Sequence, residues 1–252
     1  MTSAERYGAL VPEQAAGLLV DEQVQAAIIA SHLRGLPPDV LTQLLAGARR
    51  STVAAGQTLH RVGDCERHVE LVVAGLVRVH ATAPDGRTLT VRYCRRGALI
   101  GVLSLYSEPF VMPVTTQVVL AADLLSVDPT VLRGLADRDV RVARALLYEL
   151  SERATAFAVE IGGSTFATVR QRVARHLLDR ATPSHGELVA VLTQQELADA
   201  VGTVREVVVR TLRELRRDDV IETGRHGIRI HTLEHLLAEA YPSPGHRWNT
   251  GP

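Results

Sequence analysis

Between Ser51 and Val127 the sequence consists of short apolar runs separated by glycine. The glycines follow one another at steps of 7 to 12 residues, apart from the last pair: Gly56, Gly63, Gly75, Gly86, Gly97 and Gly101. Glycine accepts the positive φ angles of tight turns, and a pair such as Asp85-Gly86 between apolar runs is typical of a β-hairpin. Many short strands at this spacing predict a β-barrel or β-roll.

After Pro129 the apolar residues change to a helical period. They recur at alternating steps of four and three, a heptad stripe that keeps one side of a helix facing a partner. Either the helix dimerises along this stripe, or it is a core helix packed on the roll. The expected dimer-interface residues are Ala143, Leu147, Leu150, Ala154, Phe157 and Ile161. Gly162-Gly163 then predicts a hinge, because two glycines cost about 2 kcal/mol of helix propensity, and Ser164 is expected to cap the next helix.

The segment Leu192–Glu222 predicts two short helices joined by a tight turn. A linker over Ala181–Glu187 is expected to precede it. Thr193 stands three residues before Glu196, the arrangement of a capping box. Gly202 ends the first helix and permits the turn of a helix-turn-helix. The second helix is expected over Val204–Arg216, with Val208, Leu212 and Leu215 as its buried stripe.

Another face of that second helix carries Arg205, Glu206, Val209, Arg210 and Arg213. A recognition helix places its N-terminal residues on base edges in the major groove. There, arginine can bind guanine O6 and N7, and glutamate can accept a hydrogen bond from cytosine N4. The alternative is a solvated face with a Glu206–Arg210 ion pair, which stabilises a helix by about 0.2–0.5 kcal/mol.

The stretch Asp218–Thr232 predicts a strand, a turn at Gly224–Gly227 and a return strand. This hairpin resembles the wing that follows many helix-turn-helix motifs, and an additional short helix is expected over Leu233–Ala240. Arg225 and Arg229 on the hairpin are expected to bind phosphates. The helices and the wing together indicate DNA binding and lower the weight of the solvated-face alternative.

At this point the chain resembles the Crp/Fnr family of bacterial transcription regulators, from roughly Leu36 to His231. The resemblance rests on the glycine-punctuated roll, the long helix after it and the stretch LTQQELADAVGTVREVVVRTLREL. It implies an α+β fold: an N-terminal cyclic-nucleotide-binding-like β-roll, a long central dimerisation helix and a C-terminal winged helix-turn-helix. The implied partners are double-stranded DNA, a second copy of the chain in a homodimer, and RNA polymerase. The expected domains are an N-terminal arm (1–35), the β-roll (36–128), the dimerisation helix and hinge (129–163), the DNA-binding domain (164–241) and a disordered tail (242–252).

The resemblance also implies a DNA-reading set. Three residues match the family's Arg-Glu-x-x-x-Arg pattern and would read a TGTGA-like half-site: Arg205, Glu206 and Arg210. Contacts to the DNA backbone are expected from Thr193, Gln195, Thr203, Arg213, Arg225 and Arg229. Two positions depart from the family: Val204 stands where a serine usually opens the recognition helix, and Gln194 stands where an arginine is common.

The cyclic-AMP site of the family needs a glutamate for the ribose hydroxyl and an arginine for the cyclic phosphate. In the matching segment, 97–116, Val102 replaces the glutamate, and Met112-Pro113 stands at the arginine position. Phe157-Ala158 replaces the Thr-Ser pair that meets adenine. We therefore expect no cofactor and, in particular, no cyclic-AMP binding of the familiar kind.

This segment is apolar, which predicts either a filled roll or a pocket for an unidentified apolar effector. The expected pocket residues are Val102, Leu103, Tyr106, Met112, Val114, Phe157 and Ala158. A redox effect through Cys65 or Cys94 is a further alternative. We expect no metal site, since surface or strand histidines are the ordinary explanation of His60, His68 and His80.

The composition limits the chemistry. All 28 basic residues other than histidine are arginine, which excludes lysine-based catalysis and suits bidentate recognition of phosphates and guanine. The formal net charge is zero, so any basic patch is local. No Ser/His/Asp order or paired carboxylates stand out, so we expect no catalytic residues and no enzyme. The rival to a DNA-binding regulator is a ligand-binding module whose winged helix contacts proteins.

The cysteine count and the hydropathy pattern indicate where the protein acts. Two cysteines are too few for a disulfide framework or a four-thiolate iron–sulfur cluster. The N-terminus lacks a signal pattern, and no apolar run reaches the roughly 18 residues of a membrane span. The sequence therefore predicts a soluble, cytoplasmic protein with no membrane partner.

Overall fold

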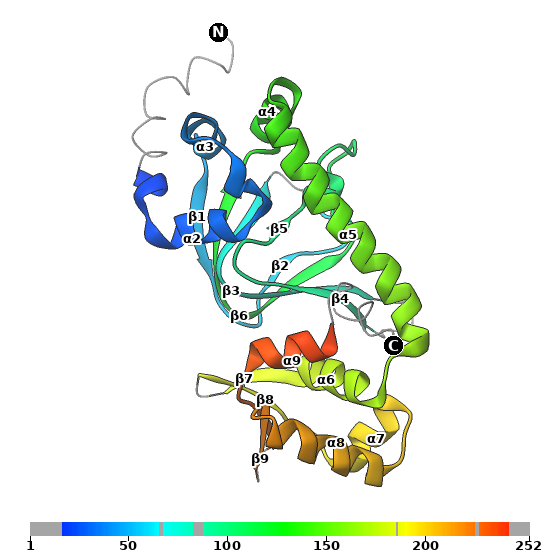
Figure 1. Ribbon diagram of the computed structural model, residues 1–252. Coiled ribbons are helices and arrows are strands. Elements are labelled where there is room, and N and C mark those ends of the chain that lie inside the picture. The colour runs from blue at the N-terminus through cyan, green and yellow to red at the C-terminus, as the bar shows by residue number, and fades with distance from the viewer. Residues whose placement is uncertain (1–16, 66–67, 83–87, 185, 225–226, 242–252) are drawn as a thin grey trace, which may run out of the picture. The chain divides into compact units, whose positions relative to one another are not determined.

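The computed structural model describes residues 17–65, 68–82, 88–184, 186–224 and 227–241, without the side chains of residues 88 and 158–166 (Figure 1). The chain forms two compact units, Met1–Thr155 and Ala156–Pro252. Among the described helices, none combines the length and the apolar character that crossing a membrane requires. The expected α+β architecture of roll, long helix and winged helix is confirmed.

The first unit is a β-roll with helices packed against it (Figure 1). Its six strands form an antiparallel sheet in the order β1-β6-β3-β4, with β2 paired to β6 and β5 to β3. The strands are β1 (Arg49–Val53), β2 (Thr58–His60), β3 (Val69–Thr82), β4 (Thr88–Cys94), β5 (Leu99–Ile100) and β6 (Thr115–Val127). The helices are α2 (Glu22–Ala30), η2 (His32–Gly35), α3 (Pro38–Leu45), η3 (Val102–Ser104), α4 (Pro129–Arg138) and the start of α5 (Val140–Phe166).

Strand β3 is apolar along most of its length because both of its faces are buried. Val69, Leu71 and Val73 pack against the helices, whereas Val72 and Val77 pack inside the roll. Alternate residues of a strand point to opposite faces, so one strand contributes to two cores. The predicted hairpin turn at Asp85-Gly86 lies outside the described residues, although the flanking strands β3 and β4 pair as expected.

Gly75 allows β3 to bend against β6. Its φ is +91°, and a Cβ there would overlap the carbonyl oxygen of Ala121 and lie 2.6 Å from the Cα of Ala122. The β3–β6 register shifts on both sides of this position, as a β-bulge does. Only glycine fits this close approach of two backbones.

The predicted N-terminal arm over residues 1–35 is wrong for its second half. Helix α2 buries Val24, Ala27 and Ile28 in the core of the first unit, and η2 adds Leu33. The i, i+3, i+4 spacing of the first three residues forms an apolar stripe that the sequence analysis did not use. Residues 17–35 therefore belong to the roll domain, and residues 1–16 lie outside the described part.

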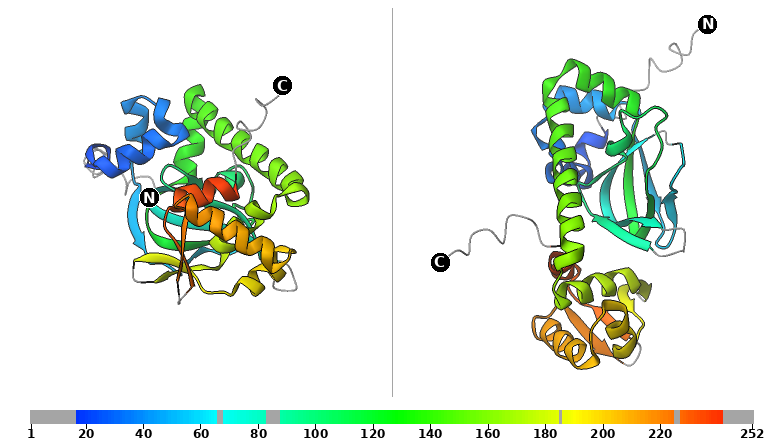
Figure 2. Two further views of the ribbon diagram at one scale, coloured as in Figure 1. Left: turned by 60° about the horizontal axis from the view of Figure 1, so that its bottom comes forward. Right: turned by 90° about the vertical axis from the view of Figure 1, so that its right-hand side faces the viewer.

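Helix α5 is one unbroken helix (Figure 2). It runs from Val140 to Phe166 and so includes Gly162-Gly163-Ser164, where the predicted hinge is therefore wrong. Glycine lowers helix propensity by about 1 kcal/mol but does not clash with the preceding turn. Thr168, rather than Ser164, caps the next helix, through a full capping box with Gln171. The break between helices therefore lies a few residues later than predicted.

The second unit is a small α+β domain. Its four-stranded antiparallel sheet has the order β7-β8-β10-β9. The elements are α6 (Val169–Arg180), β7 (Ala181–Ser184), β8 (Glu187–Ala190), α7 (Gln194–Val201), α8 (Arg205–Arg217), β9 (Ile221–Gly224), β10 (Gly227–Ile230) and α9 (Leu233–Ala240). The predicted linker over Ala181–Glu187 is wrong, because β7 and β8 pair with each other. The predicted wing is confirmed as β9 and β10; residues 225–226 and the predicted tail lie outside the described residues.

Candidate nucleic-acid interface

The first helix of the motif begins with the predicted capping box. The Thr193 hydroxyl accepts a hydrogen bond from the Glu196 N–H at 3.1 Å, and the Thr193 N–H donates to the Glu196 carboxylate at 2.6 Å. The Thr193 N–H and, to a smaller extent, the Thr193 hydroxyl lower the pKa of the Glu196 carboxyl group below its ordinary value. Because each residue satisfies a backbone N–H that the helix leaves unpaired, the start of α7 is fixed at one position.

The turn and the second helix follow as predicted, within one residue. Gly202 ends α7 with φ +66°, the left-handed conformation that favours glycine. Helix α8 then runs from Arg205 to Arg217, with Val204 as its N-cap. Its buried face comprises Val208, Thr211, Leu212 and Leu215.

The opposite face of α8 carries six exposed charged side chains: Arg205, Glu206, Arg210, Arg213, Arg216 and Arg217. We call this set the α8 charged face. In the part of the chain that the structure describes, Glu206, Arg210 and Arg213 make no hydrogen bond or ion pair. The Glu206–Arg210 ion pair of the alternative interpretation is therefore not formed. Arg217, at the end of this face, forms an ion pair with Asp218 at 3.3 Å, whereas the charges of Arg210 and Arg213 are not balanced by any side chain among the described residues.

Other arginines of the same domain are used internally. Arg170 on α6 contacts Asp218 at 2.9 Å, Glu239 at 2.9 Å and Glu214 at 3.7 Å. Arg172 donates to the carbonyl oxygen of Val201 at 2.8 Å, at the end of α7. These arginines stabilise the packing of α6 against α7, α8 and α9, whereas Arg210 and Arg213 of the α8 charged face are available to a ligand.

The remaining predicted contacts differ in their surroundings. Gln195 is exposed and donates to Asp199 at 2.8 Å, and Thr203 is half-buried in the turn. Arg229 forms ion pairs with Glu187 at 3.1 Å and Glu222 at 3.3 Å. Its charge is balanced within the sheet, so we leave it out of the proposed DNA contacts. Arg225 lies outside the described residues.

The comparisons with known proteins agree with this geometry. A Crp-like helix-turn-helix domain matches residues 171–239, and a cyclic nucleotide-binding domain matches residues 50–139. The chain is 30% identical to the transcriptional regulator SdrP of Thermus thermophilus over 67% of its own length and 83% of that protein's length. It belongs to the Crp/Fnr family of transcription regulators.

Two further similar proteins have names that state an effector. The CRP-like cAMP-activated global transcriptional regulator of Mycobacterium tuberculosis is 26% identical over 84% of this chain and 96% of its own. The structure of the c-di-GMP-responsive regulator CLP of Xanthomonas campestris has the same fold, with a TM-score of 0.54, 23% identity and coverage of 78% of this chain and all of its own. These effectors are properties of those two proteins.

The Crp/Fnr fold implies a cyclic nucleotide in the roll, and the segment Gly101–Val114 is where its ribose and phosphate would lie. Val102 and Met112, at the positions expected to hold the ribose and the phosphate, are 4% and 3% exposed. The Ser104 hydroxyl donates to the carbonyl oxygen of Val111 at 2.7 Å, which closes the loop on itself. The one charged residue of this segment is Glu108, whose negative charge would repel a phosphate. These residues do not fit a cyclic nucleotide.

The residues of the predicted apolar pocket that belong to the first unit do not face one space. Val102 packs in the core beneath the helices, whereas Met112 and Val114 pack inside the roll. Leu103 and Tyr106 are 47% and 59% exposed. The short helix η3, which follows Gly101 at φ +95°, turns neighbouring side chains in opposite directions. Phe157, in the second unit, is half-buried, and the side chain of Ala158 lies outside the described part.

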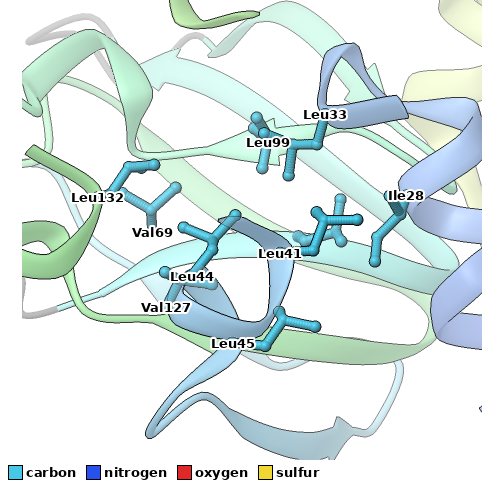
Figure 3. A pocket seen from close by; sticks show the side chains of 10 residues that line it. Ile28, Leu33, Leu41, Leu44, Leu45, Val69, Leu99, Val127 and Leu132 are labelled. Atoms are coloured by element: carbon cyan, nitrogen blue, oxygen red, sulfur yellow. The ribbon is translucent and has the colours of Figure 1, made fainter. Parts of the chain in front are cut away.

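A small cavity does exist elsewhere in the first unit (Figure 3). It is lined only by apolar side chains from α2, η2, α3 and α4 and from the strands: Ile28, Leu33, Leu41, Leu44, Leu45, Val69, Leu71, Leu99, Val127 and Leu132. It measures about 10 Å³, room for about one water-sized molecule. It offers no polar group to orient an effector, so we regard it as a packing void.

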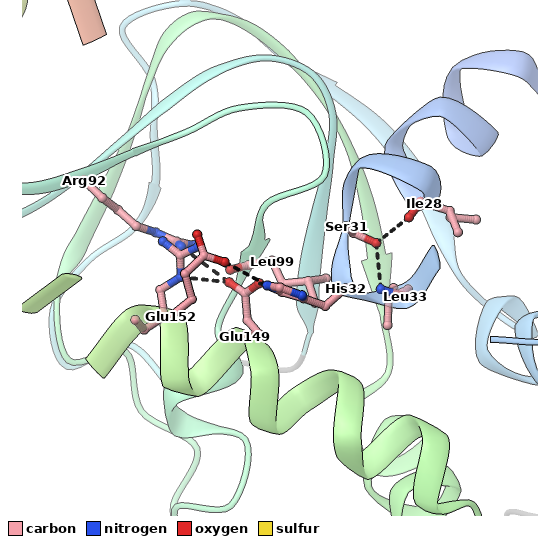
Figure 4. A network of polar contacts seen from close by, with 9 residues as sticks. Ile28, Ser31, His32, Leu33, Arg92, Leu99, Glu149 and Glu152 are labelled. Atoms are coloured by element: carbon pink, nitrogen blue, oxygen red, sulfur yellow. Dashed lines mark hydrogen bonds and ion pairs between the residues drawn. The ribbon is translucent and has the colours of Figure 1, made fainter. Parts of the chain in front are cut away.

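A polar cluster joins η2, β4 and α5, and the sequence analysis missed it (Figure 4). His32 lies 2.8 Å from Glu152 and 3.8 Å from Glu149. Glu149 is buried and contacts Arg153 at 3.0 Å and Arg92 at 3.4 Å. The oxygen and nitrogen atoms of His32, Glu149 and Glu152 lie within 4.8 Å of one another, a spacing that could hold a metal ion. The two guanidiniums already balance the carboxylates, so the cluster fits a structural role better.

The two cysteines differ in environment. Cys94 lies inside the roll, and burial raises the pKa of its thiol. A thiol held in its neutral form reacts slowly with oxidants. Cys65 is exposed, so it is the better candidate of the two for a redox response.

Proposed function

We propose that this protein is a homodimeric transcription regulator that reads a palindromic TGTGA-like operator through α8, independently of cyclic AMP. The observation that carries the proposal is the exposed α8 charged face, of which Arg210 and Arg213 have no partner among the described residues. An unneutralised arginine face costs stability by self-repulsion unless it meets an anion. Nucleic acid supplies that anion along its whole length.

The base-reading contacts follow from the N-terminal half of α8. Arg205 and Arg210 suit the paired acceptors of guanine, and Glu206 suits the amino group of cytosine. The fork of a guanidinium fixes the orientation as well as the strength of such a contact. The three residues together would therefore recognise a half-site that contains guanine and cytosine.

Contacts to the DNA backbone would fix the position of α8 along the major groove. Arg213 lies on the same exposed face, about one helical turn beyond Arg210 and about two turns beyond Arg205 and Glu206. Thr193, Gln195 and Thr203 lie at the starts of the two helices, where unpaired backbone N–H groups and the helix dipole favour a phosphate. RNA polymerase is the further partner that we propose for the DNA-bound protein.

Helix α5 supports the homodimer. Val142, Ala145 and Leu146 are buried within the first unit, whereas Leu147 is 62% exposed. Ala143 and Leu150 are partly buried, Ala154 is exposed, and Phe157 is half-buried. A second copy of α5 packed along this stripe would remove the exposed leucine from water. The side chain of Ile161, the last residue of the stripe, lies outside the described part.

Independence from cyclic AMP is supported by the segment around Val102 and Met112, which is closed and contains no positively charged residue. A buried cyclic phosphate without a positive partner would cost several kcal/mol. The DNA-competent arrangement would then be set by packing rather than by this ligand.

A salt titration tests DNA binding and separates it from the rival, a winged helix that contacts proteins. With Arg213 of each protomer neutralising one phosphate, two per dimer, the affinity for operator DNA falls by about 10-fold between about 50 and 200 mM salt. Arg213→Ala lowers the affinity for all sequences and makes this salt dependence shallower. A flat salt dependence, unchanged by that substitution, would contradict phosphate binding and favour the rival.

A further inference from the structure

Val204 occupies an unusual place for a valine. It is the N-cap of α8, its side chain makes no capping hydrogen bond, and it is 59% exposed. Valine is a poor N-cap, less stable there than serine or threonine by about 1 kcal/mol. The neighbouring helices α6 and α7 both begin with a threonine capping box. Local stability therefore does not explain the valine.

Val204 lies beside a residue of the proposed base-reading set. It immediately precedes Arg205, whose guanidinium lies 3.4 Å from the side-chain oxygen of Gln194. Its isopropyl group has no proton to donate to a phosphate. A β-branched side chain is stiff at χ1, so little rotamer freedom is lost when it is held against a ligand.

The major groove presents one apolar group to such a side chain, the C5-methyl of thymine. We propose that Val204 is a specificity-determining residue that packs on a thymine methyl next to the base pair read by Arg205. This inference rests on the proposed function, since it needs α8 in the major groove. It adds a requirement for a methyl group that the three charged residues do not impose.

The test uses the full-length protein and an operator selected by the wild-type protein from duplexes with randomised half-sites. Each thymine of the half-site is replaced in turn by deoxyuridine, which removes the methyl and keeps the hydrogen bonds. Affinity is measured for wild type, Val204→Ser and the control Val62→Ser. Val62 is an equally exposed valine, 61%, on the β-roll.

At one thymine per half-site, we expect deoxyuridine to weaken wild-type binding by about 4-fold, from about 0.8 kcal/mol per buried methyl. The replacement in both half-sites should weaken it by about 15-fold. Val204→Ser should bind both duplexes equally, and Val62→Ser should behave as wild type.

Two results would overturn the inference in distinguishable ways. If the selection returns no preferred sequence, the proposed function fails and the inference fails with it. Only the role of Val204 is overturned if an operator is selected but no thymine methyl contributes to the binding affinity. The same holds if each methyl contributes equally to the affinities of wild type and Val204→Ser.

Discussion

The guanidinium of Arg205 donates to the side-chain oxygen of Gln194 at 3.4 Å. The two residues begin the two helices of the motif, so this contact places the start of α7 and the start of α8 on one surface. Thr193 and Val204, the N-caps of these helices, flank the pair. A single DNA groove and its adjacent backbone could therefore meet both helix starts.

Replacement of Arg205 by alanine should relax base specificity. We expect a loss of about 1–3 kcal/mol of discrimination at one base pair of the half-site, because a bidentate arginine–guanine contact is removed. Arg217→Ala is the matched control, since it also removes one positive charge from α8. Arg217 lies at the far end of the helix, 76% exposed, and contacts only the adjacent Asp218 among the described residues. Equal losses of discrimination in both variants would contradict the reading role of Arg205.

Replacement of Leu147 by glutamate should convert the proposed dimer into a monomer. A charge in each copy would face its symmetry mate along the α5 stripe, where like charges repel. Light scattering coupled to size-exclusion chromatography reports the mass. Val62→Glu is the control, because Val62 is 61% exposed and Leu147 is 62% exposed. A dimer that persists in Leu147→Glu would place the interface elsewhere.

Replacement of Thr193 by alanine should lower the stability of the second unit by about 1 kcal/mol, because two capping hydrogen bonds lose their geometry. Thr193→Ser keeps the hydroxyl and should restore most of this stability. Denaturant unfolding followed by circular dichroism gives both values. No difference between alanine and serine at this position would show that the capping box contributes little.

Replacement of Gly75 by alanine should destabilise the roll. The left-handed backbone costs a non-glycine residue about 1–3 kcal/mol, and the overlap with the backbone at Ala121 and Ala122 adds to this. Gly35→Ala is the control, since a Cβ there meets no atom within 4 Å. The melting temperature should fall clearly for the first variant and little for the second. A small effect at Gly75 would mean that β3 can shift away from β6.

Asp139 should make the corner between α4 and α5 sensitive to acid. The side chain and backbone N–H of Arg141 hold the pKa of Asp139 at about 2, below its ordinary value of 3.8. A carboxyl group with a lowered pKa stabilises the fold above its unfolded pKa and loses this effect as the pH falls through the folded pKa. Stability should therefore fall between about pH 4 and pH 2, and Asp139→Asn should remove that part of the dependence. Identical acid titrations of both proteins would contradict the assignment.

The parts of the fold that depend on local chemistry were predictable from the sequence. The Thr193–Glu196 capping box, the turn at Gly202 and the buried stripe of Val208, Leu212 and Leu215 each require only residues a few positions apart. The wing followed from its paired glycines in the same way.

The parts that depend on distant packing were not predictable. The break expected at Gly162-Gly163 is absent, because helix propensity is a weak determinant beside the rest of a long helix. The strand pairing of Ala181–Ser184 requires β8 as its partner. The proposed pocket failed because η3 separates Val102 from Met112 into different cores, and periodicity alone does not show on which side of a curved sheet a loop residue lies.

The central claim is that α8 reads a TGTGA-like operator without cyclic AMP, and fluorescence anisotropy on a labelled TGTGA-N6-TCACA duplex tests it most directly. We predict tight binding to this duplex over a scrambled one, with the same affinity whether cyclic AMP is present or absent. Binding that appears only with cyclic AMP would contradict the structural argument from Val102 and Met112. Equal binding to the scrambled duplex in both conditions would contradict the proposed reading set.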